Sequence, residues 1–325
     1  MSNTKPRLYL HIGSSKTGSS AIQAFMAQNT EQLAARGFWY PTIGRQDDIQ
    51  LLDAHHLLAS GISFGATALH KAFFDKNNMS EYFSDCIEQL KAGAADRPQC
   101  ATVLSSEYLW GLISPRFIGR ISELTEDFDT KIIVYLRRQD LWLQSMYNER
   151  VKAGERKSFS AWSAEFLKRP RVCLNYMRIL RQWASVVGRK NVIVQVYEKS
   201  PRPQDIYADF ASVLSISDID GFAIPLNTVN PSADARGMSI LRFFNRLGTT
   251  GYFRNKIVLP FLIRRNRRTL HAPLHFMPAD DAQTLLDRFQ RSNDRVAETY
   301  FDPPRQELFT DPEPTIDNWK PATND

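Results

Sequence analysis

The chain has 325 residues, 43% of them hydrophobic, and its 41 lysines and arginines against 35 aspartates and glutamates give a formal net charge of +6. A chain of this length can bury enough apolar surface to fold without metal or disulfide support. Its longest apolar run, 257–263, is interrupted by Pro260 and is shorter than the ~20 residues of a membrane-spanning helix, so we expect no such helix.

Strand and helix patterns alternate along the chain. Apolar runs of strand length occur at 7–12, 38–40, 101–104, 131–136 and 191–197, and helical patterns between and after them include 81–92, 140–153, 160–167, 174–187 and 206–214. This alternation predicts an α/β fold with a central parallel sheet of four or five strands, helices on both faces, and helical insertions at 42–98 and 153–188. We assign residues 1–301 to this domain. Residues 302–325, with five prolines and six acids, are expected to be an extended or disordered tail.

The N-terminus and the cysteines indicate a compartment. Residues 1–7 lack the apolar core and the small-residue cleavage site of a secretory signal. Cys86, Cys100 and Cys173 are odd in number and widely spaced, which suits neither a disulfide framework nor a tetrahedral metal site. We therefore expect a cytoplasmic protein whose cysteines are reduced and structural.

A loop rich in glycine and serine, Gly13–Ser20, follows the first strand and leads into a helix. Glycines let the backbone wrap around a ligand, and a helix N-terminus adds partial positive charge, so the loop can bind an anion. In the nucleotide-triphosphatase P-loop the lysine follows the second glycine. Here Lys16 precedes Gly18, and Ser19 occupies the usual lysine position. The loop favours phosphate binding, and a simple structural turn is the alternative.

A second candidate anion site follows the 131–136 strand. A magnesium-dependent phosphotransferase would place an acidic metal ligand at such a strand end, whereas this chain has Arg137 and Arg138. Ser145 comes eight residues after Arg137, so a guanidinium and a hydroxyl could converge on one phosphate. Ligands of open parallel sheets bind at the carboxyl ends of the strands. The two candidate sites together favour a ligand with two separated phosphates. The alternative is that the arginines are solvated charges at the edge of the sheet.

Three stretches, in this order, resemble one family. HIGSSKTGSSAIQ, LSSEYLW and VYLRRQDLWLQSMYNERV are similar to the bacterial branch of the sulfotransferases that use 3′-phosphoadenosine 5′-phosphosulfate (PAPS). The resemblance extends over roughly the first 200 residues, through NVIVQVYE, and fades afterwards. It implies PAPS as donor, adenosine 3′,5′-bisphosphate as product, and no required metal.

The resemblance also assigns residues to the two ends of the donor. In the family the loop holds the 5′-phosphosulfate, and the Arg and Ser of the later motif hold the 3′-phosphate. The second role maps onto Arg137 and Ser145. In the loop, serines stand at positions 19 and 20, where threonine is commoner in the family, and they keep the hydroxyl group. The first role maps onto Lys16, Thr17, Gly18, Ser19 and Ser20, and Ser15 of the same loop is a further candidate for binding the donor.

Sulfuryl transfer needs a cation on the leaving phosphate oxygen and a base for the acceptor proton. Lys16 is the candidate cation. Glu107, just after a predicted strand, and His55 and His56, in a short helical segment, are the candidate bases. Neighbouring helical residues point about 100° apart, so at most one histidine should face the site. We favour Glu107, with a structural role as the alternative for each, and we expect His11 to be packed in the core.

Two features lie beyond the resemblance. Arg236, after Asn230 and Ser232, could contribute to a loop that closes over the nucleotide, although turn and N-cap roles for Asn230 and Ser232 are the favoured alternative. Between Ala235 and Ala279 the chain has nine basic residues and no acidic one, and subtracting these nine charges from +6 leaves the remainder at −3. This indicates a local anionic partner rather than a general nucleic-acid surface.

Within that segment, residues Tyr252–Arg268 join an apolar run to four arginines. Such a stretch can lie on an anionic membrane, which would place the protein peripherally at the inner membrane face. A core segment followed by a solvated basic turn, or a wall of a cleft for an acidic substrate, is the alternative.

The sequence thus predicts a sulfotransferase that moves a sulfuryl group from PAPS to a hydroxyl of a carbohydrate or glycolipid, with no nucleic-acid partner. The displaced lysine and the missing acidic strand end disfavour a nucleotide-dependent kinase. A non-catalytic nucleotide- or glycan-binding module is the second alternative, against which the retained Lys16, Arg137 and Ser145 argue.

Overall fold

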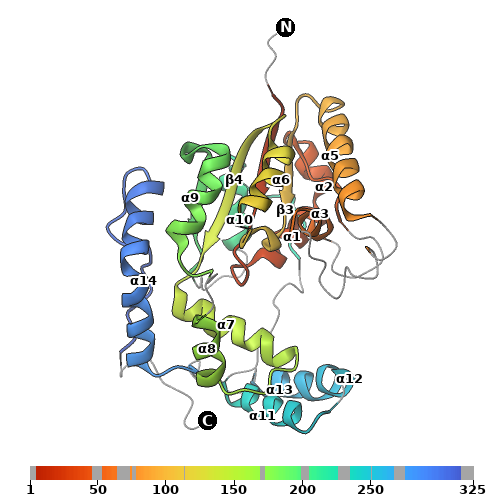
Figure 1. The fold of residues 1–325 in the computed structure, drawn as a ribbon. Coiled ribbons are helices and arrows are strands. Elements are labelled where there is room, and N and C mark those ends of the chain that lie inside the picture. The colour runs from red at the N-terminus through yellow and green to blue at the C-terminus, as the bar shows by residue number, and fades with distance from the viewer. Residues whose placement is uncertain are drawn as a thin grey trace. The chain divides into compact units, whose positions relative to one another are not determined.

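A five-stranded parallel sheet forms the centre of one of the two compact units of the chain (Figure 1). The computed structural model describes residues 5–45, 53–63, 74, 78–112, 114–168, 173–198, 205–225, 235–249, 251–266 and 275–315. The strands are β1 (Arg7–His11), β2 (Phe38–Trp39), β3 (Ala101–Ser105), β4 (Asp129–Leu136) and β5 (Val192–Val196), in the order β2-β3-β1-β4-β5. All neighbouring pairs are parallel, which confirms the predicted sheet.

The strand order places the start of the glycine-rich loop at a switch point. β1 lies between β3 and β4, with Leu10 paired to Leu104 on one side and to Ile132 on the other. The chain first builds the side with β2 and β3 and then crosses to β4 and β5. Ligands of open parallel sheets bind at the carboxyl ends of the strands where the order reverses, which here is the end of β1.

Helices cover both faces of the sheet because both faces carry apolar side chains. Side chains such as Tyr9 and Tyr135 pack with α1 (Ser19–Gln28) and α10 (Asp205–Val213). Leu8, Leu10 and Val134, which alternate with them along the strands, are equally buried. The other helices of this unit are α2 (Thr30–Ala34), α3 (His56–Ser63), α5 (Met79–Ala95), α6 (Pro115–Thr125) and α9 (Tyr176–Val187). The sequence had predicted that α9 belongs to an insertion at 153–188. Instead, α9 contacts β4 and β5 and covers the sheet itself.

The chain divides into two compact units, and the sheet unit comprises residues 1–136, 176–229 and 296–306. The second unit comprises residues 137–175, 230–295 and 307–325. Its core joins the aromatic side chains of Trp142, Tyr147 and Trp162 to Leu241 and Leu285. Its helical elements are α7 (Gln139–Lys152), α8 (Phe159–Leu167), α11 (Ala235–Arg246), α12 (Gly251–Phe253), the π-helical turn η3 (Arg254–Val258), α13 (Leu259–Asn266) and most of α14 (Ala279–Tyr300).

A buried ion pair fixes the start of α7 in the second unit. The Arg138 guanidinium donates from Nε to Asp140 Oδ1 at 2.8 Å and from Nη2 to Asp140 Oδ2 at 2.9 Å. Its Nη1 donates to the carbonyls of Asp311 and Pro312 at 2.8 and 2.7 Å. Arg138 is therefore a structural residue. Residues 302–315 of the expected tail contain no helix or strand, yet these bonds and the buried Leu308 anchor part of that segment.

Replacing Asp140 with alanine should destabilise the protein by about 3–5 kcal/mol, because it leaves the buried Arg138 charge without its counter-charge. Urea unfolding measures the loss. Glu298→Ala, which removes an exposed carboxylate on α14, is the control and should change stability by less than about 0.5 kcal/mol. Equal effects of the two substitutions would contradict a stabilising role for this pair.

Candidate active site

The loop after β1 is held by backbone bonds to β4. Ser14 N donates to Tyr135 O at 3.0 Å, and Tyr135 N donates to Gly13 O at 2.7 Å. Three residues of the loop have positive φ: Gly13 at 93°, Lys16 at 67° and Gly18 at 81°. At Gly13 there is no room for a side chain, since a Cβ there would lie 2.9 Å from the Glu107 Cβ. The loop therefore starts in direct contact with Glu107.

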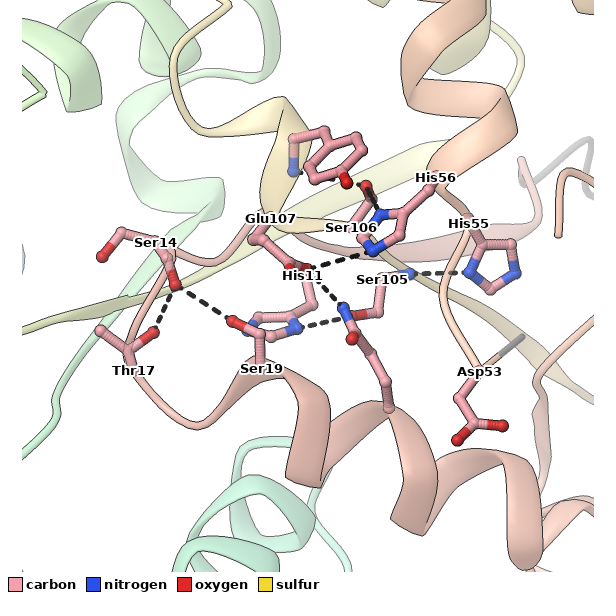
Figure 2. A network of polar contacts seen from close by, with 12 residues as sticks. His11, Ser14, Thr17, Ser19, Asp53, His55, His56, Ser105, Ser106 and Glu107 are labelled. Atoms are coloured by element: carbon pink, nitrogen blue, oxygen red, sulfur yellow. Dashed lines mark hydrogen bonds and ion pairs between the residues drawn. The ribbon is translucent and has the colours of Figure 1, made fainter. Parts of the chain in front are cut away.

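The hydroxyl groups of the loop have different roles. Thr17 Oγ1 and Ser19 Oγ, both buried, donate to Ser14 O at 2.6 and 3.0 Å and so close the loop on itself (Figure 2). While they make these bonds, their hydroxyl protons are not available to a ligand. Ser20 is exposed, and Ser15 and Lys16 are half-buried. The sequence grouped these residues as one binding set, whereas the structure separates loop-closing hydroxyls from accessible side chains.

Glu107 and His56 form a polar pair beside the loop. Glu107 begins the short 3₁₀ turn η1 (Glu107–Leu109) after β3. Its Oε2 accepts a hydrogen bond from Gln23 Nε2 at 2.8 Å and lies 3.8 Å from His56 Nε2. The two side chains are only 17% and 15% exposed. The sequence named Glu107 and His56 as alternatives, but the structure brings them together (Figure 2).

Neighbouring side chains orient the His56 ring. Its Nδ1 lies 2.8 Å from Ser106 Oγ, and the ring stacks on Tyr108 with centroids 4.0 Å apart. Burial lowers the pKa of His56, and the Glu107 carboxylate opposes this shift. At neutral pH the lowered pKa keeps the imidazole uncharged, so it can accept a proton.

His55 is a structural residue, which corrects its prediction as a candidate base. Its Nδ1 accepts a hydrogen bond from Ser105 N at 3.0 Å, and its Nε2 lies 3.0 Å from Pro41 O. Burial, with a smaller effect of Arg45, holds the pKa of His55 well below its usual range. Both ring nitrogens are occupied by backbone groups, so neither can take a proton from a substrate.

A buried hydrogen-bond network, which the sequence analysis did not predict, holds the Glu107 carboxylate in place. His11 Nδ1 lies 2.8 Å from Ser105 Oγ, which also accepts from Gln23 Nε2 at 3.2 Å. Gln23 thus connects this network to Glu107. The one signal in the sequence was a glutamine among the apolar residues of the first helix, where it is buried. His11 is in the core, as predicted, and burial lowers its pKa to about 3.

The remaining predicted residues belong to the second unit. Arg137 directly follows β4 in the chain, Ser145 lies within α7, and both side chains are partly buried. Arg236 lies in the first turn of α11, which begins at Ala235, and not in a loop. Asn230 and Ser232 lie outside the described residues. The assignment of Arg137, Ser145 and Arg236 to nucleotide binding stays a prediction.

Two absences hold for the residues that the structure describes. Within those ranges no three His, Cys, Asp or Glu side chains lie together so as to hold a metal ion. No helix within the same ranges has both the length and the apolar character needed to cross a membrane.

Comparisons with known proteins give weak likenesses. No family model matches the chain. An uncharacterized protein of Archaeoglobus fulgidus is 26% identical over 186 residues, which are 57% of this chain and 49% of that protein, so the chain spans about half the length of the curated relative that it matches. Two solved structures are similar in part: a sulfotransferase from Alicyclobacillus acidocaldarius and the sulfotransferase domain of the Synechococcus PCC 7002 olefin synthase.

The first of these structures is 18% identical, with a TM-score of 0.44 over 77% of this chain and 94% of that one. The second is 16% identical, with a TM-score of 0.42 over 89% of this chain and 97% of that one. None of these likenesses assigns an activity to this chain.

The buried histidines should make stability fall with acid. A folded-state pKa below the unfolded value of about 6.5 means that stability is present above pH 6.5 and is lost as pH falls below it. For His11, whose pKa is lowered to about 3, the loss at pH 5 is about 2 kcal/mol. Urea unfolding at pH 7 and pH 5 measures it. In His11→Asn the difference between the two pH values should shrink by about 2 kcal/mol, and an unchanged difference would contradict this origin.

Proposed function

We propose that this chain transfers a sulfuryl group from PAPS to a hydroxyl acceptor. The observation that carries the proposal is the contact between Gly13 and Glu107, which joins the glycine-rich loop, the candidate anion site, to a carboxylate with a histidine beside it. A phosphosulfate needs the first and the acceptor hydroxyl needs the second. Lys16 on the loop adds the cation for the leaving group.

The chemistry assigns one task to each group. The acceptor oxygen forms a bond to sulfur while the bond between sulfur and the phosphate oxygen breaks. The acceptor proton passes to the carboxylate of Glu107, with the neutral His56 imidazole as the alternative base. The Lys16 ammonium neutralises the charge that develops on the leaving phosphate, which departs as adenosine 3′,5′-bisphosphate.

Glu107 is the favoured base because it lies in direct contact with the start of the glycine-rich loop. It starts a turn at the end of a central strand, and the Gln23 amide fixes its Oε2. The neutral His56 imidazole, with Nε2 at 3.8 Å from that oxygen, is the alternative acceptor of the proton. We assign Arg137 and Ser145 to the 3′-phosphate, and a carbohydrate or glycolipid as the acceptor, on the strength of the sequence.

Nucleotide binding gives the first test. Adenosine 3′,5′-bisphosphate at about 100 times its dissociation constant should stabilise the protein by about 2.7 kcal/mol, and ATP with magnesium should stabilise it less. Arg137→Ala should weaken binding by about 1.5–3 kcal/mol and abolish the preference over the analogue that lacks the 3′-phosphate. Thermal unfolding measures both. Stabilisation by ATP and magnesium alone would instead support a kinase.

Substituting Lys16 with alanine should lower turnover about 10²- to 10³-fold, with a smaller effect on nucleotide affinity, because the charge on the leaving oxygen is greatest in the transition state. The assay follows label from radiolabelled PAPS into acceptors of a fractionated cell extract. Lys190→Ala, at an exposed position of the same unit, is the matched control. Normal turnover in Lys16→Ala would refute the role of the loop.

Glu107→Gln and His56→Ala identify the base. Loss of the true base should cost about 10²- to 10⁴-fold in turnover while adenosine 3′,5′-bisphosphate still binds. We expect the larger loss in Glu107→Gln. Near-normal activity in that variant beside an inactive His56→Ala would transfer the role to the histidine, and binding without turnover in the unsubstituted protein would favour the non-catalytic module.

A further inference from the structure

Large apolar side chains are concentrated on the outer side of one part of the second unit. They belong to α11 and the turn after it, α12, η3 and α13, which follow one another in the chain and contact each other (Figure 1). Their exposed fractions range from 37% to 74%. Elsewhere in the described ranges only Tyr108 and Ile224 are large hydrophobic residues of comparable exposure. We call this group the apolar face: Phe243, Leu247, Tyr252, Phe253, Ile257 and Phe261.

The same helical segments also supply part of the core, so buried and exposed apolar side chains occur side by side along them. Leu241 of α11, Val258 of η3 and Leu262 of α13 are buried in the core of the unit. Phe243 and Leu247 are exposed four residues apart, and Phe244 between them contacts Phe253 with ring centroids 6.0 Å apart. The apolar run that the sequence treated as one block is thus divided between core and surface.

Basic side chains accompany the apolar face. Arg246, Lys256 and Arg264 are exposed, and each lies within three residues of an apolar-face residue in the chain. No Asp or Glu occurs between Ala235 and Ala279. Apolar side chains next to bases are typical of segments that lie in an anionic membrane interface, where the apolar groups enter the acyl boundary and the bases meet lipid phosphates.

The charge pattern disfavours a second copy of this chain as the occupant. A two-fold symmetric contact brings the same patch of both copies together. Bases would then face bases with no acidic residue of the segment to compensate them, and like charges across an interface oppose binding. An anionic lipid surface complements both the apolar and the basic side chains.

We propose that the apolar face and its flanking bases dock the protein peripherally on an anionic lipid surface. This docking does not depend on the proposed sulfuryl transfer. The proposed docking surface includes Phe243 and Leu247, so it is larger than the Tyr252–Arg268 stretch for which the sequence predicted membrane contact. It rests on the described side chains and not on Arg265, Arg267 or Arg268, whose side chains lie outside the description.

The test is co-sedimentation with vesicles of phosphatidylcholine, with and without phosphatidylglycerol. Binding should require phosphatidylglycerol and decrease as salt is raised. Lys256→Gln with Arg264→Gln should weaken it about 5-fold per base, or about 25-fold together. Ile257→Ser with Phe261→Ser should weaken it at least about tenfold per side chain. Thermal unfolding should stay unchanged because all four side chains are exposed.

Lys190→Gln with Ile224→Ser, which removes an exposed base and an exposed apolar side chain of the other unit, is the matched control and should bind like the unsubstituted protein. No binding to phosphatidylglycerol vesicles at low salt would overturn the proposal. So would equal binding by the apolar-face variants. Dimerisation in sedimentation velocity that Ile257→Ser with Phe261→Ser abolishes, without vesicle binding, would assign the face to a second copy.

Discussion

The close contact between Gly13 and Glu107 is the constraint on which the candidate site depends. A Cβ at position 13 would lie 2.9 Å from that of Glu107, so a residue without a side chain is needed there. The contact exists because β1 and β3 are adjacent and parallel, which brings the segments after their carboxyl ends to the same edge. The glycine-rich loop and the Glu107 carboxylate thereby become neighbours although Gly13 and Glu107 are 94 positions apart in the chain.

Buried polar groups then set the position of the carboxylate. Gln23 donates to Glu107 and to Ser105, and Ser105 Oγ also contacts His11. Unpaired polar groups in this interior would be costly, so the network holds Glu107 in one orientation. The arrangement gives Glu107 a fixed oxygen next to His56, as the proposed transfer of the acceptor proton to Glu107 requires.

In the second unit, residues that are close together in the chain divide between the buried core and the surface. Its bidentate pair of Arg138 and Asp140 is buried and fixes the start of α7, while Arg137, one residue earlier, remains partly accessible. In α11–α13 the same helical segment turns Leu241 and Leu262 inward and Phe243 and Phe261 outward. Two adjacent arginines or two neighbouring apolar residues can thus have unrelated roles, according to which side of a helix or loop they occupy.

The sequence by itself determined the five strands, the parallel α/β architecture and the glycine-rich loop, because burial on both faces and the need for positive φ leave local patterns. It also identified Lys16 as the candidate cation and Glu107 and His56 as candidate bases. Only the tertiary structure decided that Glu107 and His56 form a pair and that Thr17 and Ser19 close the loop. It also decided that the ring nitrogens of His55 bind backbone groups of Ser105 and Pro41. These roles depend on which groups meet through the order of the strands and the path of a loop, and neither residue type nor spacing records such contacts.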